Sequence, residues 1–130
     1  MPEILLVDDD EGTRSLFVEI ANLADFQIHT ASSGEEFFRL YDEQQPDLLI
    51  LDLVMPNMDG LELMRKLLVL KCRLPLLVIS GYDYINEEGL ELLSHGLNFK
   101  GFIKKPFNVV ELRNLLTELV LPDETVLPPA

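Results

Sequence analysis

Three short runs of consecutive apolar residues constrain the fold of this chain more than any other feature. They are Ile4–Val7, Leu48–Leu51 and Leu76–Ile79, and Pro75 stands at the entry to the third run. Strands that are buried on both faces read as continuous apolar runs, and such strands belong to parallel sheets covered by helices. Proline is tolerated at the first position of a strand. We therefore predict three central strands of a parallel sheet.

Segments with helical spacing alternate with these strands. Apolar residues that recur every three or four positions predict amphipathic helices, and capping residues predict where the helices begin and end. The first helix has Phe17, Ile20, Ala21 and Ala24 on one face, and the second opens at Ser33 with Glu36 and runs to about Gln44. The third runs from Gly60 to about Leu70, with Leu61, Met64, Leu67 and Leu68 inward. The fourth spans Ile85 to His95 and is followed by Gly96, and the fifth starts at Asn108, with the apolar residues Val109, Leu112, Leu115, Leu116 and Leu119.

Two further strands complete the pattern. Residues Phe26–Thr30 alternate between apolar and polar, which indicates an edge strand, and Phe102–Ile103 forms a short strand. Strands that alternate with helices imply a parallel sheet with right-handed crossovers, and five such units favour an open, doubly wound α/β fold. We expect one domain over residues 1–121, with a Pro-rich tail or linker over residues 122–130.

Polar side chains follow the ends of four predicted strands. Asp8 and Asp9 follow the first strand, Asp52 the third, Ser80 the fourth, and Lys105 stands near the end of the fifth. Because the carboxyl ends of parallel strands meet at one edge, these groups should share one crevice. Each taken alone has a common structural explanation, such as a helix start or a turn. All of them at the same end of successive strands indicate one site.

The types of these side chains indicate phosphoryl transfer. Three carboxylates repel one another unless a cation neutralises them, and oxygen ligands without His or Cys suit Mg²⁺. Lys105 is a point charge suited to a phosphate oxygen, while the Ser80 hydroxyl and the Gly81 amide can donate hydrogen bonds. Positioning and charge neutralisation are what phosphoryl transfer requires. A carboxylate would be the nucleophile and would form an acyl phosphate.

Charge and composition exclude several classes of protein. The formal net charge of −13 opposes direct binding to nucleic acid. Cys72 is the only cysteine, which excludes a disulfide framework and fits a reducing cytosol. No apolar run approaches the roughly 20 residues of a membrane span, and the N-terminus lacks the basic region of a signal peptide. We expect a cytoplasmic protein without a membrane partner.

The motifs resemble the receiver domain of bacterial two-component response regulators. The resemblance covers Ile4 to about Leu119, and its most specific part is the segment from Leu48 to Gly60, with Asp52, Met-Pro and Asp-Gly at the family's spacing. Ile4–Asp9 resembles the family's first strand and acidic pair, and Lys105-Pro-Phe its Lys-Pro-Phe motif. The resemblance implies a flavodoxin-like or CheY-like (βα)5 fold with strand order 2-1-3-4-5.

The resemblance also implies a role for each site residue. Asp52 would accept a phosphoryl group from a sensor histidine kinase or a phosphotransfer protein. Asp9 would bind Mg²⁺ directly, Asp8 mainly through water, and the Val54 carbonyl would supply another ligand. Lys105 would pair with the phosphoryl group.

Phosphorylation would switch the conformation of the domain. Ser80 would close on the phosphoryl oxygen and Phe102 would turn inward, which changes the face built from the last two strand–helix units. Phe102 replaces the family's more common Tyr, and the segment between Ser80 and Lys105 is longer than usual. The expected partner is a downstream effector or an output domain outside this chain, and dimerisation on phosphorylation stays open. The domain would assist its own phosphorylation and dephosphorylation rather than act as an enzyme on other substrates.

Two alternatives compete with this interpretation. Asp8 and Asp10 faintly resemble the Asp-x-Asp motif of haloacid-dehalogenase-type phosphatases, in which Asp8 would be the nucleophile and Asp10 the acid/base. That interpretation leaves the Asp52 segment unexplained. The second alternative is a binding module with the receiver fold that never accepts a phosphoryl group.

Overall fold

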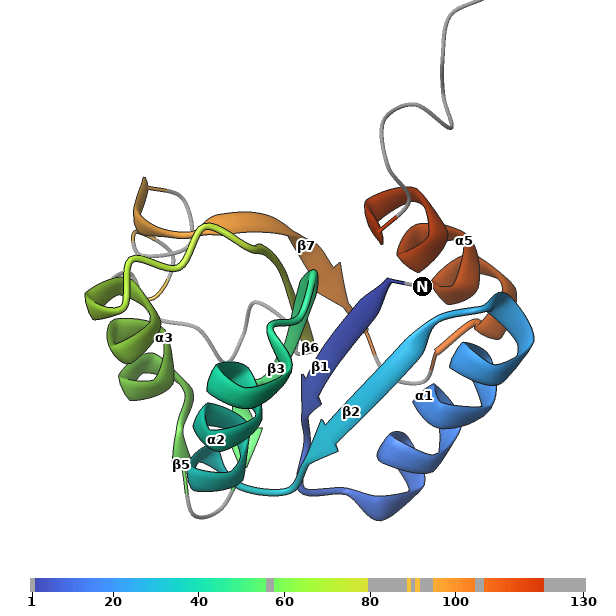
Figure 1. Cartoon of the computed structure of the whole chain (residues 1–130), viewed down its shortest axis with the longest axis horizontal. Helices are drawn as coiled ribbons and strands as arrows, with labels where there is room; N and C mark the ends of the chain where they lie inside the picture. The colour runs from blue at the N-terminus through green and yellow to red at the C-terminus, as the bar shows by residue number, and fades with distance from the viewer. Residues whose placement is uncertain are drawn as a thin grey trace, which may run out of the picture.

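Five parallel strands form the centre of the molecule. The computed structural model in Figure 1 describes residues 2–55, 58–79, 89, 91, 95–104 and 107–120. The strands are β1 (Glu3–Val7), β2 (Gln27–Ala31), β3 (Leu48–Asp52), β6 (Pro75–Ile79) and β7 (Asn98–Ile103). They lie in the order β2-β1-β3-β6-β7, so the predicted order 2-1-3-4-5 is confirmed when the five strands are counted along the chain.

Helices cover both faces of this sheet. They are α1 (Glu11–Ala24), α2 (Gly34–Gln44), α3 (Gly60–Val69) and α5 (Val109–Val120). Helices α1 and α5 pack on one face, and α2 and α3 on the other (Figure 1). The helix predicted over residues 85–95 falls mainly outside the described residues. Within the described part of the chain, no helix is both long enough and apolar enough to cross a membrane.

Side-chain caps fix where two of the helices begin. The Ser33 hydroxyl accepts a hydrogen bond from the Glu36 amide at 3.2 Å, and the Asn108 side chain accepts one from the Glu111 amide at 3.1 Å. Both bonds satisfy amides that have no partner within the first turn of a helix. The Glu36 carboxylate accepts from the Ser32 amide at 2.8 Å, one residue before the position of an ordinary capping box. The predicted starts at Ser33 and Asn108 are therefore confirmed.

The central strands are buried on both faces, as the apolar runs predict. In β1, Leu5 and Val7 pack toward α2 and α3, while Ile4 and Leu6 pack toward α1 and α5. Side chains alternate between the two faces of a strand, so each run contributes to two separate clusters. Burial of each such side chain contributes roughly 1.5–3 kcal/mol. The two clusters stabilise the central strands from both faces, and so fix the edge of the sheet where these strands end.

The buried face of α3 differs from the prediction by one residue. Leu63 is fully buried and Leu68 is 39% exposed, whereas the sequence pattern placed Leu68 inward. The observed face begins at the buried Gly60 and continues through Leu63, Met64 and Leu67. Glycine adds nothing to an apolar pattern, so the pattern begins at Leu61, misses Leu63 and includes Leu68. The prediction for Leu68 was wrong for that reason.

The edge strands also differ from their predicted bounds. β7 begins at Asn98, well before the predicted Phe102–Ile103, and its pairing with β6 shifts by one residue at Lys100. Gly101 follows with φ of 149°, a conformation that favours glycine. β2 begins after Phe26, which is buried, and it lies at the sheet edge as predicted. Bulges and single-residue shifts interrupt the alternation from which strands are recognised.

A small antiparallel pair follows β3, and the sequence pattern did not predict it. Strands β4 (Val54–Met55) and β5 (Met58–Asp59) pair through Val54 with Asp59 and through Met55 with Met58. The pair connects the end of β3 to the first residue of α3. It thereby brings Gly60 close to Leu53.

We expect Gly60→Ala to destabilise the protein by roughly 1–3 kcal/mol, the usual cost of overpacking. A Cβ atom at Gly60 would lie 2.6 Å from Leu53 Cδ2 and 3.0 Å from its Cα, so backbone would have to move. Gly12→Ala is the control, because the nearest atom there, Asp10 Oδ2, is 3.4 Å away. The free energy of unfolding of Gly12→Ala should rise by up to about 1 kcal/mol, because alanine has the higher helix propensity. Urea unfolding followed by far-ultraviolet circular dichroism measures both, and equal stability of Gly60→Ala and wild type would contradict the expectation.

Candidate functional site

The carboxyl ends of four strands lie level with one another. Val7 pairs with Leu51, so Asp8 and Asp52 each follow the last residue of that ladder. Asp52 in turn pairs with Ile79, and Ile79 pairs with Ile103. Residues that directly follow these positions therefore start from the same edge of the sheet. This register is the physical basis for a shared site.

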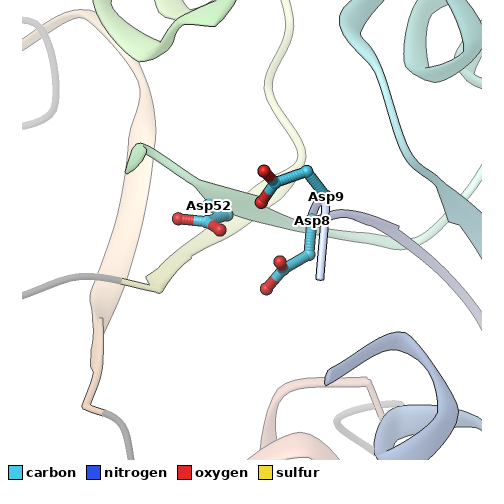
Figure 2. A group of neighbouring side chains, drawn as sticks. All are labelled: Asp8, Asp9 and Asp52. Carbon is cyan, nitrogen blue, oxygen red and sulfur yellow. The ribbon is translucent and has the colours of Figure 1, made fainter. Parts of the chain in front are cut away.

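Three carboxylates gather at this edge. One oxygen atom from each of Asp8, Asp9 and Asp52 lies within 4.8 Å of the others. Asp8 is 0% exposed and Asp52 is 4% exposed, while Asp9 is open to solvent. Figure 2 shows the three side chains clustered where β1 and β3 end. The predicted grouping of these three residues is confirmed as geometry.

Hydrogen bonds fix the position of Asp8. Its Oδ1 atom accepts from the Asp10 amide at 2.9 Å, and its own amide donates to the Ala31 carbonyl at 3.0 Å. The Arg14 guanidinium donates to the Asp8 carbonyl at 2.8 Å. The acidic loop after β1 is therefore tied to both β2 and α1. A rigid carboxylate loses little conformational entropy when it binds a ligand.

Asp10 has a different role from its two neighbours. Its carboxylate accepts hydrogen bonds from the Thr13 amide at 2.9 Å and from the Thr13 hydroxyl at 2.7 Å, so it caps the start of α1. It does not belong to the group of three carboxylates. The run of acidic residues in the sequence thus divides between a helix cap and the site. Capping is a structural task, which leaves Asp10 poorly suited to be an acid/base catalyst.

The donor set fits a hard divalent cation. Mg²⁺ binds oxygen atoms at about 2.0–2.1 Å, so two ligands of one ion lie roughly 3–4 Å apart. Carboxylate oxygens within 4.8 Å of one another reach that spacing through small shifts. Within the described ranges, no other group of acidic, His or Cys side chains meets the same spacing. The two buried carboxylates gain most from a cation, because burial strengthens their mutual repulsion.

The other predicted site residues are only partly described. Phe102 lies in β7, half-buried, with its ring 4.9 Å from that of Phe99. Val54 lies in β4, two residues after Asp52. Ser80 and Lys105 lie outside the described residues. The roles assigned to these four residues stay predictions.

The comparisons with known proteins identify the class of this fold and site. A family model described as the response regulator receiver domain matches residues 4–117. The chain belongs to this family, whose members are the phosphoacceptor switches of two-component signalling systems. Receiver domains bind Mg²⁺ in an acidic pocket and interact with histidine kinases and output effectors. The haloacid-dehalogenase alternative finds no support in these comparisons.

Individual relatives agree with the family. The chain is 30% identical over 116 residues to sporulation initiation phosphotransferase F of Bacillus subtilis, which covers 86% of this chain and 88% of that protein. It is 29% identical to the B. subtilis alkaline phosphatase synthesis transcriptional regulatory protein PhoP, but spans only 51% of it. Among solved structures, a response regulator from Colwellia psychrerythraea is 34% identical, with a TM-score of 0.74 over 91% of this chain and 95% of that one. A CheY-like receiver domain from Methanospirillum hungatei is 25% identical, with a TM-score of 0.80 over 92% of this chain and 94% of that one.

Proposed function

We propose that Asp52 is the phosphoacceptor of this receiver domain. The observation that carries the proposal is the position of Asp52 at the end of a central strand, 4% exposed and clustered with Asp8 and Asp9. A nucleophile needs one accessible oxygen and a site that excludes bulk water. Asp9 is more exposed and Asp8 is fully buried, so Asp52 combines the two requirements best.

The proposed reaction transfers one phosphoryl group. A carboxylate oxygen of Asp52 attacks the phosphorus atom of a phosphohistidine, the P–N bond breaks, and the imidazole leaves. Water later attacks the acyl phosphate, which restores the carboxylate and releases inorganic phosphate. Catalysis of both steps rests on positioning and charge neutralisation. The domain thereby assists its own phosphorylation and dephosphorylation.

Asp8, Asp9, Asp52 and the Val54 carbonyl are the proposed holders of Mg²⁺. Asp9 would bind directly, because it is the solvent-open member of the cluster, and Asp8 mainly through water. When bound, Mg²⁺ supplies charge neutralisation for the carboxylates and the incoming phosphoryl oxygens. The Asp10–Thr13 cap keeps the acidic loop in place.

Lys105 and Ser80 are the proposed contacts of the phosphoryl group. Their neighbours in the chain support this, because Lys104 directly follows β7 and Ile79 ends β6 at the same edge as Asp52. Ser80 would move toward the phosphoryl oxygen, and Phe102 would turn inward in response. The free energy of this population shift equals the difference between the interaction free energies of the phosphoryl group with the two states. The affected surface would include β7, α5 and the preceding predicted helix.

The proposed partners follow from the family. A sensor histidine kinase or a phosphotransfer protein would donate the phosphoryl group, and an effector or an output domain would read the result. The chain spans about half of the transcriptional regulator PhoP and a quarter of the regulatory protein AtoC of Escherichia coli. We propose that residues 1–121 form the receiver and that residues 122–130 form a tail or linker.

Incubation with acetyl phosphate and Mg²⁺ tests the proposal. Intact-mass measurement should show one phosphoryl adduct, peptide mapping should place it on Asp52, and a chelator should abolish it. An adduct on Asp8 would support a phosphatase-type nucleophile instead. A protein that takes no adduct from acetyl phosphate or from any phosphorylated histidine kinase would be a silent binding module.

Asp10→Asn separates the receiver from the phosphatase interpretation. We expect this variant to reach the same extent of phosphorylation as wild type, because asparagine retains the oxygen that accepts from Thr13. Loss of the cap in Asp10→Ala should cost about 1 kcal/mol of stability and serves as the structural comparison. An Asp10→Asn protein that folds normally but no longer takes up the phosphoryl group would argue for an acid/base role of Asp10.

A further inference from the structure

A groove lies between α2 and α3, on a face of the molecule that the phosphoryl chemistry does not use. Its volume is about 930 Å³, near the upper end of ordinary ligand pockets. The rings of Phe38 and Tyr41 line one side, and Leu63 and Val69 line the other. Both walls are helices, so the groove offers no strand edge for an extended peptide. Helical walls of this kind suit a third helix laid between them.

The aromatic wall is preorganised. The rings of Phe38 and Tyr41 lie 6.5 Å apart, and the Lys66 ammonium lies 5.5 Å from the centre of the Phe38 ring. Burial raises the pKa of Tyr41 to about 12, and the neighbouring Cys72 side chain acts in the same direction. The ring contact and the cation contact hold Phe38 and Tyr41 in place in the absence of a ligand. A wall that does not need to be ordered on binding favours affinity.

Exposed apolar side chains continue the groove at the end of α3. Val69 is 80% exposed and Leu70 is 52% exposed, and both line the groove. The preceding residue, Leu68, is 39% exposed. Val69 and Leu70 thus form a small exposed apolar patch at the end of the groove, and an exposed apolar patch beside a groove is one mark of an interaction site. The patch gives an incoming helix an apolar contact beyond the aromatic wall.

The charged residues of the groove select the partner. Glu35, Asp42 and Glu62 line it and are exposed, against the single ammonium of Lys66. A second copy of this chain carries a net charge of −13 and would be repelled. A segment with Lys and Arg beside its apolar residues would be attracted, and the attraction would also speed its association.

We propose that the α2–α3 groove is a docking site for a basic amphipathic helix of a partner protein. Apolar side chains of that helix pack against Phe38, Tyr41 and Val69, and its basic residues face Asp42 and Glu62. The site is separate from the acidic cluster and does not require phosphorylation of Asp52. Its binding is therefore testable on the unphosphorylated protein.

The test uses a fluorescein-labelled synthetic peptide with Leu at helical i, i+3, i+4 and i+7 positions and Lys elsewhere. Fluorescence anisotropy measures its dissociation constant for the full chain, and amide hydrogen exchange locates the contact. Glu62→Lys should weaken binding about tenfold, while Glu19→Lys makes the same charge change on exposed α1 and should have little effect. Val69→Ser should weaken binding about fivefold, while Leu23→Ser, at a similarly exposed apolar position, should not.

Each outcome decides the proposal. Selective loss with the groove variants, with protection confined to α2 and α3, supports it. Equal loss with Glu19→Lys, or protection spread over the whole surface, would mean non-specific attraction to an acidic protein and would overturn it. Equally tight binding of the matched peptide with Glu in place of Lys would overturn the proposal that the groove prefers a basic helix. Sedimentation velocity tests whether a second copy of this chain occupies the groove. A wild-type dimer that becomes monomeric in Val69→Ser would show a self-interface and would overturn the proposal.

Discussion

Replacing Asp52 with asparagine is expected to abolish phosphorylation by acetyl phosphate completely. Asparagine keeps the size of the side chain but has no carboxylate oxygen to form an acyl phosphate. Asp42→Asn is the control, because Asp42 is an exposed carboxylate in α2, away from the cluster. Intact mass after incubation with Mg²⁺ should show the adduct on wild type and on Asp42→Asn only. An adduct of equal extent on Asp52→Asn would assign the phosphoacceptor to another residue.

The same variant should also change stability, and the sign depends on Mg²⁺. The carboxylate oxygens of the cluster lie within 4.8 Å of one another. Two charges at that distance repel by roughly 3 kcal/mol at an effective dielectric constant of 20, and by less where one of them is solvated, as Asp9 is. Removing one charge should therefore raise the free energy of unfolding by about 1–2 kcal/mol without Mg²⁺. Wild type should recover the difference as Mg²⁺ is added, because the ion binds only the folded state. Asp52→Asn should respond much less.

Thermal unfolding over a Mg²⁺ titration measures this second effect. The wild-type midpoint should rise with Mg²⁺ concentration, and the rise should be smaller for Asp52→Asn. Asp42→Asn should follow wild type at every concentration. An equal rise for all three proteins would mean that Mg²⁺ stabilises the fold at some place other than the cluster.

Phe37→Ala should cause the largest loss of stability, about 3–5 kcal/mol. Phe37 is 0% exposed, and its ring lies 5.1 Å from the ring of Phe38 and 6.3 Å from that of Tyr41. The loss combines the transfer energy of a buried ring, the cavity that remains, and the aromatic contacts. It is a large part of the roughly 5–15 kcal/mol that stabilises a typical domain.

Urea unfolding followed by far-ultraviolet circular dichroism measures the loss, since the chain has no Trp to report it by fluorescence. Val69→Ala is the control, because Val69 is 80% exposed on the neighbouring helix α3. Its stability should stay within about 0.5 kcal/mol of wild type. Comparable losses for the two variants would show that the α2–α3 face is not packed around Phe37.

Physical rules of parallel sheets explain how much the sequence determined. A continuous apolar run such as Leu48–Leu51 is compatible with burial on both faces, which requires helices above and below the sheet. Parallel strands end at one edge, so the residues after Val7 and Leu51 had to meet there. The doubly wound parallel sheet and the grouping of Asp8 and Asp9 with Asp52 were therefore predictable from the pattern of strands and helices, whereas the strand order was implied by the family resemblance. The cap at Ser33 was predictable as well, because capping is local.

Tertiary structure decided what depends on packing and on backbone direction. The sequence predicted that Asp8 and Asp9 would join Asp52, but it did not reveal that Asp10 would cap α1, because that depends on how the chain leaves β1. The buried face of α3 depends on Gly60, which no apolar pattern marks. The shift at Lys100 and the β4–β5 pair are backbone irregularities without an apolar signature. The groove between α2 and α3 exists only because the sheet sets the spacing of these two helices, which β3, β4 and β5 separate along the chain.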